Sequence, residues 1–433
     1  MARISFPLFR LGFLKNLGGV IDEACKRGHH VNLLYDISDK SYHKGIPAPN
    51  IFNISKFKYG QPELVGFNGI ANLSDTVSKI SDVLVVHQGL PPDFLHQNNP
   101  KIEQFLSIKK SDIPIISLMS HFYDNCLFPL EVYEFFDKTC LLSPYSYDAH
   151  KQLLIQLSSL SDFPEKYDEK RIDQVFRNKV EVTGSALFDI FDQIYQERTL
   201  DDNNDLILFV PKFDSHPYMK VILNNHNRLT SFVYSLFRYN GRYTSEIIKV
   251  PRFKKFLKTL NKFAKSQNLS IIAKSRPKHG EQYQKLLSKI SKTYISGEDD
   301  EFYPNFTTST IFKKALFSIH IRTFSVLEAV IAGVPAIHFQ IPIFDDNDIK
   351  NIYDWKKRYF TQLIRSSNPD SLFNFSGCVW NIKLKDSIEF FNNISLEDLR
   401  QSSDRRKEYC SYFCGISEEP AAQRQLNVIE QYL

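Results

Sequence analysis

Short apolar runs alternate with helical segments along the chain, and this rhythm restricts the fold more than any other feature. In the first half, the runs that we expect to form strands are Arg3–Phe9, His30–Tyr35, Asp82–His87, Ile113–Met119, Thr139–Leu142 and Glu181–Gly184. Runs this short and this apolar are typical of strands buried on both faces of a parallel sheet. Between the first two, we expect a loop containing Gly12, Gly18 and Gly19 and a helix over Val20–Arg27, ended by Gly28.

The same rhythm returns in the second half. The expected strands are Leu206–Val210, Leu269–Lys274, Leu316–Ile321 and Ala336–Ile341, and the expected helices are Arg252–Gln267 and Val326–Gly333. An acidic, polar stretch from Leu187 to Asp205 is the best candidate for a linker. Since 433 residues suit two domains of about 200 each, we predict an α/β protein with two Rossmann-like domains facing across a cleft. The predicted domains are 1–195 and 205–393, followed by a helical tail over 394–433 that breaks near Gly415–Pro420.

Charge and composition exclude several classes of protein. The net charge is +5, from 54 basic and 49 acidic residues, which is too balanced for a nucleic-acid binder. One basic patch contains Arg252, Lys254, Lys255, Lys258 and Lys262. It fits either a solvated helix face or attraction to an anionic membrane or polyanionic acceptor.

The sequence contains no apolar span of about 20 residues and no signal peptide, so we expect no membrane-spanning helix. The six cysteines have no metal-ligand spacing and are expected to be free thiols in a reducing cytosol. We therefore expect a cytoplasmic protein, with peripheral contact to the inner face of the membrane as a further expectation.

The segment Ile321–Ile341 is the most informative for function. A strand is expected to end at Ile321, with Arg322, Thr323 and Ser325 in the turn and a helix immediately after it. Amide groups at such a turn suit a phosphate, and Arg322 adds a positive charge. Glu328, one helical turn on, could accept hydrogen bonds from both ribose hydroxyls. The alternative is an ordinary strand–helix–strand unit with a surface glutamate.

Lys274, Arg276 and Lys278 form a second cationic group, at the end of an expected strand. They could neutralise the phosphates of a donor or belong to a solvated loop. Neither pair of adjacent aspartates, Asp299–Asp300 or Asp345–Asp346, forms a convincing metal-binding motif. We therefore expect no metal and no cofactor.

Two histidines at expected strand ends of the first half are candidate bases. His87 follows DVLVV, and His121 follows IISLMS with Asp124 three residues later. A nearby aspartate would fix the imidazole tautomer or raise its basicity. The alternative for each is a hydrogen-bonded structural histidine. Ser143, at the next strand end, is a weaker candidate for a substrate contact.

Several of these segments resemble a known group. SVLEAVIAGVPAI, at 325–337, resembles the C-domain signature of GT-B glycosyltransferases and of their relatives among CDP-glycerol glycerophosphotransferases and surface-carbohydrate enzymes. EVTGSALFD at 181–189, LILFVPKF at 206–213 and IIAKSRPKH at 271–279 are similar to stretches of the same group. The tail from Gly415 resembles its C-terminal motif but lacks the Asp-Gly pair.

The resemblance covers mainly residues 181–433. It implies that Ser325 holds the donor phosphates and that Glu328 holds the ribose. It further implies a transferase that moves a sugar or sugar-like group from a UDP-, CDP- or CMP-linked donor, or from CDP-glycerol. The acceptor would be a glycan or a lipid-linked molecule in surface polysaccharide synthesis. A nucleotide-sugar 2-epimerase and a non-catalytic binding protein of the same fold remain as alternatives.

Overall fold

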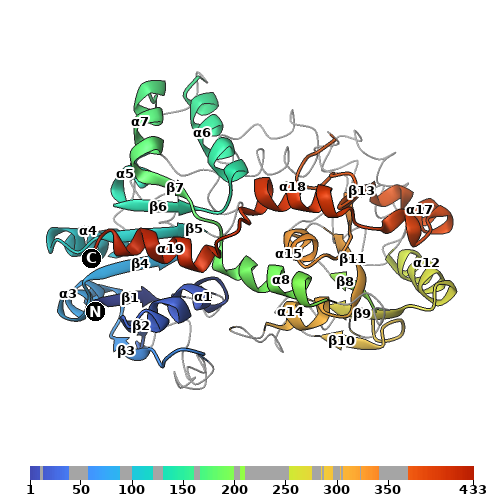
Figure 1. The fold of residues 1–433 in the computed structure, drawn as a ribbon, viewed down its shortest axis with the longest axis horizontal. Coiled ribbons are helices and arrows are strands. Elements are labelled where there is room, and N and C mark those ends of the chain that lie inside the picture. The colour runs from blue at the N-terminus through green and yellow to red at the C-terminus, as the bar shows by residue number, and fades with distance from the viewer. Residues whose placement is uncertain are drawn as a thin grey trace, which may run out of the picture. The chain divides into compact units, whose positions relative to one another are not determined.

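We describe the fold from a computed structural model of the 433-residue chain. The described residues are 1–9, 13–38, 57–87, 100–119, 130–159, 166–198, 205–209, 253–275, 284, 287–295, 303, 306–321, 323–340 and 369–433. The chain divides into two compact units (Figure 1). Unit 1 contains Met1–Ile190, Phe302–Phe306 and Cys410–Leu433, and unit 2 contains Phe191–Glu301 and Thr307–Tyr409.

Unit 1 is built on a seven-stranded parallel sheet. In spatial order the strands are β3 (Glu63–Phe67), β2 (His30–Asp36), β1 (Arg3–Pro7), β4 (Val83–His87), β5 (Ile115–Met119), β6 (Lys138–Leu141) and β7 (Val180–Val182). The chain builds outward from β1 to β3 and then restarts on the other side of β1 with β4. This reversal makes β1 and β4 the topological switch point, beside whose carboxyl ends open α/β sheets bind ligands.

Helices cover this sheet on both faces. They are α1 (Phe13–Lys26), α3 (Leu73–Ile80), α4 (Pro100–Lys110), α5 (Leu130–Phe135), α6 (Pro144–Ser159), α7 (Glu169–Lys179), α8 (Ala186–Glu197) and α19 (Ala421–Glu430), with a 3-10 turn, η2 (Ile70–Asn72). The expected loop around Gly18 and Gly19 was wrong, because both glycines lie inside α1. A Cβ atom on Gly19 would lie 2.9 Å from the Cβ atom of Ala186, so close packing explains that glycine.

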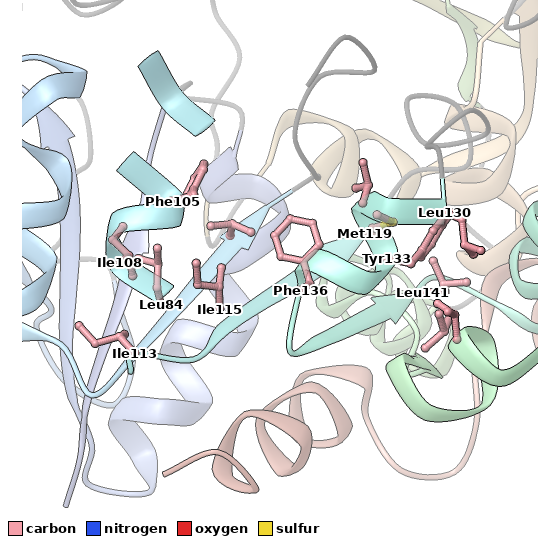
Figure 2. Packing of buried hydrophobic residues seen from close by; sticks show 14 of the residues in the cluster. Leu84, Phe105, Ile108, Ile113, Ile115, Met119, Leu130, Tyr133, Phe136 and Leu141 are labelled. Atoms are coloured by element: carbon pink, nitrogen blue, oxygen red, sulfur yellow. The ribbon is translucent and has the colours of Figure 1, made fainter. Parts of the chain in front are cut away.

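Two apolar clusters bury the faces of the first sheet. Figure 2 shows part of one, in which Phe105, Ile108, Tyr133 and Phe136 of α4, α5 and their flanking segments pack on strands β4, β5 and β6. In the other, α1 and α19 pack together over β1 and β2, with Leu17 and Leu426 both fully buried. Burial on both faces explains why these strands are short and almost uniformly apolar.

Unit 2 repeats the plan with six parallel strands. Their spatial order is β10 (Thr293–Ile295), β9 (Ser270–Lys274), β8 (Asp205–Phe209), β11 (Ala315–Ile321), β12 (Ala336–Gln340) and β13 (Val379–Lys383). The other elements are α12 (Phe253–Ser266), α14 (Thr307–Phe312), α15 (Ser325–Ile331), η6 (Leu384–Asp386), α17 (Ser387–Asn393), η7 (Glu397–Leu399) and α18 (Ser403–Cys414). Here the order reverses between β8 and β11. Both sheets therefore have the Rossmann strand order, which confirms the prediction of two Rossmann-like α/β domains.

The two faces of the second sheet differ in polarity. Alternate residues Phe317, Ile319 and Ile321 of β11 belong to an apolar cluster with α12 and α17. Within it, the ring of Phe263 on α12 lies 6.0 Å from that of Phe317. The residues between them, Ser318 and His320, point to the opposite face, because side chains alternate along a strand. One face of β11 is thus a hydrophobic core, and the other carries buried polar groups.

Helices occupy two of the boundaries between the units along the chain. The segment expected to be a linker is helical over Ala186–Glu197, and the division falls inside this helix, between Ile190 and Phe191. It falls again inside α18, between Tyr409 and Cys410. The prediction of a mostly helical tail with a break was confirmed, since α18 ends at Cys414 and α19 begins at Ala421. None of the described helices has the length and hydropathy needed to cross a bilayer.

Candidate functional site

The segment from β11 to α15 lies at the switch point of the second sheet. Strand β11 ends at Ile321, and α15 begins at Ser325, as the sequence predicted within one residue. Thr323 is buried, whereas Ser325 and Glu328 are half-buried. Glu328 lies three residues after Ser325 on α15, so both side chains occur on one side of the helix. Because β8 and β11 are the strands where the order reverses, the turn occupies the position at which such sheets bind ligands.

A buried chain of hydrogen bonds connects this turn to strand β11. The Nε2 atom of His320 lies 2.7 Å from the hydroxyl oxygen of Ser318, and its Nδ1 atom lies 3.0 Å from that of Ser325. The Ser325 hydroxyl in turn lies 3.1 Å from that of Thr323. The His320 ring is fully buried and stacks on Phe209 at 4.8 Å. These bonds fix both hydroxyls of the turn to the interior of the sheet.

The partners of His320 indicate its tautomer. Ser318 donates to the carbonyl oxygen of Pro335 at 3.4 Å, so its oxygen accepts from Nε2–H of His320. The Nδ1 atom then accepts from the Ser325 hydroxyl, whose oxygen accepts from Thr323. Burial, together with the nearby His338, holds the pKa of His320 well below its usual value. His320 is therefore a neutral structural link and not a proton donor at neutral pH.

A transverse row of polar side chains continues from His320 across the sheet. His338 on β12 pairs in register with His320, and Asn381 on β13 pairs with His338. The Nδ1 atom of His338 lies 3.2 Å from the amide oxygen of Asn381. Burial lowers the pKa of His338 to about 4, so this histidine is also neutral near pH 7. Neighbours in a parallel sheet share a face, which places this row on the side of the sheet that faces away from α12.

The same register connects Lys274 with the site. Lys274 ends β9 and pairs with Phe209, which pairs with His320. Lys274 and His320 are thus two strands apart, which corresponds to about 10 Å. Lys274 is buried, and its Nζ atom donates to the carbonyl oxygen of Ser275 at 3.4 Å. The structure brings Lys274 to the same sheet edge as Thr323 and Ser325.

Two arginines, one buried and one half-buried, contact the far end of α15. Arg406 of α18 donates to the carbonyl oxygens of Val330 and Ile331, and it pairs with Asp192 at 2.8 Å. Arg198, which follows α8, donates to the carbonyl oxygens of Gly333 and Ala315. The bonds to Ile331 and Gly333 satisfy carbonyl groups at and just after the end of α15, and Arg198 also contacts the start of β11 through Ala315. Helix α15 is therefore fixed at its start by His320 and at its end by arginines.

In unit 1, His87 ends β4 beside β1, which is the switch point of the first sheet. Its side chain is buried, and its ring lies 4.6 Å from that of Phe13 at the start of α1. Ser143, after β6, exchanges hydrogen bonds with Ser146 at the start of α6. Ser143 therefore serves as a helix cap. Its proposed contact with a substrate has no support in this geometry.

Five predicted site residues lie outside the described part of the chain. They are His121, Asp124, Arg276, Lys278 and Arg322. Sequence reasoning missed His320 and Ser318, although a signal was present, because polar residues alternate with apolar ones in LFSIHI. Within the described residues, no group of three or more His, Cys, Asp and Glu side chains could hold a metal ion.

The comparisons with known proteins agree with this architecture. The chain is similar in structure to the UDP-GlcNAc 2-epimerase of Methanocaldococcus jannaschii, with a TM-score of 0.53, 11 % identity and 99 % coverage of both chains. It is similar to the wall teichoic acid polymerase TagF, with a TM-score of 0.52, 10 % identity, and 99 % of this chain and 88 % of that one covered. It is also similar to MnaA of S. aureus, solved with UDP, with a TM-score of 0.51, 10 % identity, and 100 % and 97 % covered.

These similarities identify the fold as the GT-B fold, which confirms the fold implied by the resemblance in the sequence. No protein-family model and no curated protein sequence matches the chain. At 10–11 % identity the three structures establish the architecture alone.

Proposed function

We propose that the chain is a GT-B transferase that moves a sugar or sugar-like group from a nucleotide-activated donor to a glycan or lipid-linked acceptor in surface polysaccharide synthesis. The observation that carries this proposal is the turn of Thr323 and Ser325, anchored by His320 at the switch point of the second sheet. The similarity in fold to a UDP-GlcNAc 2-epimerase and to MnaA, which was solved with UDP, supports a nucleotide as the ligand.

The proposed donor site divides its roles by chemistry. Thr323, Ser325 and the cationic groups of Lys274, Arg276 and Arg322 would contact the phosphates, and charge neutralisation would stabilise the leaving nucleotide without a metal. Glu328 would accept hydrogen bonds from the ribose hydroxyls. In unit 1, a base chosen from His87 and His121, the latter with Asp124, would take the proton of the acceptor hydroxyl. The protein would act in the cytoplasm.

A nucleotide-binding screen tests the donor site. Purified protein would be titrated with UDP, CMP, CDP, GDP and ADP while the thermal midpoint is measured. We expect one nucleotide to raise the midpoint, and Glu328→Gln to weaken its binding by roughly 10- to 100-fold through the loss of charge-assisted hydrogen bonds. Glu389→Gln is the matched control, because Glu389 is an exposed carboxylate on α17 in the same unit. A flat response to all five nucleotides would refute the donor site.

The product distinguishes transfer from the alternatives. With the nucleotide identified, the matching activated sugar would be incubated with the protein and a glycan acceptor. Release of nucleotide together with a lengthened acceptor indicates transfer. Conversion of the nucleotide sugar into its 2-epimer, with no dependence on acceptor, would instead assign an epimerase. Binding without any turnover would indicate a non-catalytic protein.

A further inference from the structure

Helix α12 separates its charged and apolar residues onto opposite sides. Its sequence, FKKFLKTLNKFAKS, contains five lysines and no acidic residue. At about 100° per residue, the five lysines fall within an arc of roughly 100°. They are Lys254, Lys255, Lys258, Lys262 and Lys265, called here the α12 lysine face. The apolar residues Phe256, Leu260 and Phe263 occupy the opposite arc and are buried in the core of unit 2.

The α12 lysine face is exposed to solvent. All five lysines are exposed, and none of them forms an ion pair within the described part of the chain. Helix α17, which packs beside α12 (Figure 1), contributes the carboxylate of Glu389, which does not reach them. The described lysines elsewhere in the chain include several with carboxylate partners, such as Lys151 with Asp173 at 2.7 Å. The α12 lysine face is therefore a concentrated positive charge in a chain whose net charge is only +5.

We infer that the α12 lysine face docks the protein electrostatically on an anionic lipid bilayer. Its lysines extend over roughly 16 Å of helix at about 1.5 Å per residue, which presents a broad surface and not a groove for one ligand. Lysine supplies point charges, without the planar fork with which arginine recognises a single phosphate. No aromatic side chain is exposed on α12 to stack on the bases of a nucleic acid.

The burial of the apolar side of α12 defines the mode of binding. Phe256, Leu260 and Phe263 are 5 % exposed or less, so they cannot insert between lipid tails. The attraction is then purely electrostatic and acts within a Debye length of the surface. Binding should therefore require anionic headgroups and should disappear at high salt. This inference does not depend on the identity of the nucleotide donor.

The test compares two triple variants of equal net charge. The first is Lys254→Gln, Lys258→Gln and Lys262→Gln, which neutralises the centre of the α12 lysine face. The matched control is Lys110→Gln, Lys170→Gln and Lys407→Gln, because these exposed lysines lie on three different helices, α4, α7 and α18. Both variants of the full chain would be checked for an unchanged thermal midpoint, since all six side chains are exposed.

Binding would be measured by co-sedimentation with phosphatidylcholine vesicles, with and without phosphatidylserine. We expect the wild type and the control to bind only the anionic vesicles. The α12 variant should lose about 5-fold in partition coefficient per lysine, or about 100-fold in total. Equal losses in both variants would overturn the inference, because net charge alone would then explain binding. Absence of wild-type binding, or binding to soluble inorganic polyphosphate without binding to vesicles, would overturn it as well.

Discussion

The Nδ1 atom of His320 lies 3.0 Å from the hydroxyl oxygen of Ser325, so a residue inside the second sheet holds the first side chain of α15. A surface loop that binds a ligand gains precision when its side chains are anchored to a rigid element. Here the anchor is a neutral imidazole stacked on Phe209 and bonded at both nitrogens. The hydroxyls of Thr323 and Ser325 are thus held in place by the protein itself.

This relationship predicts energetic coupling between the two residues. His320→Phe keeps the stacking but removes both hydrogen bonds, and it should lower the free energy of unfolding by about 2–3 kcal/mol. Ser325→Ala should cost less, because Ser325 is half-buried. In a double-mutant cycle measured by urea unfolding, the coupling should be about 1 kcal/mol. Strictly additive effects would show that the bond does not contribute to stability.

The contacts of Arg406 with α15 predict that two neighbouring arginines of α18 contribute very differently to the free energy of unfolding. Arg406→Met should destabilise by about 3 kcal/mol, because it leaves buried carbonyl groups and Asp192 without their partner. Arg405→Met should cost at most about 1 kcal/mol, since its ion pairs with Glu408 and Asp370 are exposed. Chemical unfolding of the two variants measures the difference. Similar costs would contradict the proposed role of Arg406.

The effect of Gly18→Ala on stability should change sign when Tyr303 is removed. A Cβ atom at Gly18 would lie 2.2 Å from the ring of Tyr303, whose hydroxyl donates to Asp22 at 2.6 Å. Gly18→Ala should therefore destabilise the wild-type protein, although alanine favours a helix by about 1 kcal/mol.

In a Tyr303→Ala background the clash is removed, and the same substitution should stabilise. Thermal midpoints of the four proteins test this expectation. A stabilising Gly18→Ala in the wild type would contradict the contact with Tyr303.

The buried histidines predict a loss of stability in acid. Burial lowers the pKa of His338 and of His150 from 6.5 to about 4. Between these values the unfolded chain binds a proton that the folded chain excludes, so stability is complete above pH 6.5 and falls as the pH drops toward 4. Each shift corresponds to roughly 3 kcal/mol at most.

Urea midpoints measured from pH 7 to pH 5 should fall, and His150→Gln should reduce the slope. Glutamine retains a hydrogen-bonding group near Tyr133, whose hydroxyl lies 2.7 Å from His150. A slope unchanged by this substitution would contradict the buried, neutral state of His150.

The sequence predicted the apolar strands well because burial on both faces leaves a strong signal. Both β11 and β12 were placed within about one residue. Strands β3, β10 and β13 were not predicted. They are edge strands of their sheets and contain polar residues such as Glu63, Thr293 and Asn381. Edge strands are half-solvated, so their composition resembles that of loops.

The errors in helices and in the site have physical causes as well. Glycines inside α1 were interpreted as a loop, although they are needed where Tyr303 and Ala186 approach the helix. The acidic stretch that contains α8 was interpreted as a linker, but Phe191 is fully buried there. The anchor at His320 depends on a partner that follows five residues later, across a strand end. Contact across a turn of this kind is not visible in spacing alone.

Unit 1 is assembled from both ends of the chain. Gln425 of α19 donates to the carbonyl oxygen of Gly184, and Glu430 pairs with Arg27 at 2.7 Å. Leu426 completes the apolar layer over α1. During synthesis on the ribosome, α1 therefore emerges long before its packing partner exists. The apolar side of α1 that Leu426 covers therefore remains exposed to water or to a chaperone until the entire second unit has been translated.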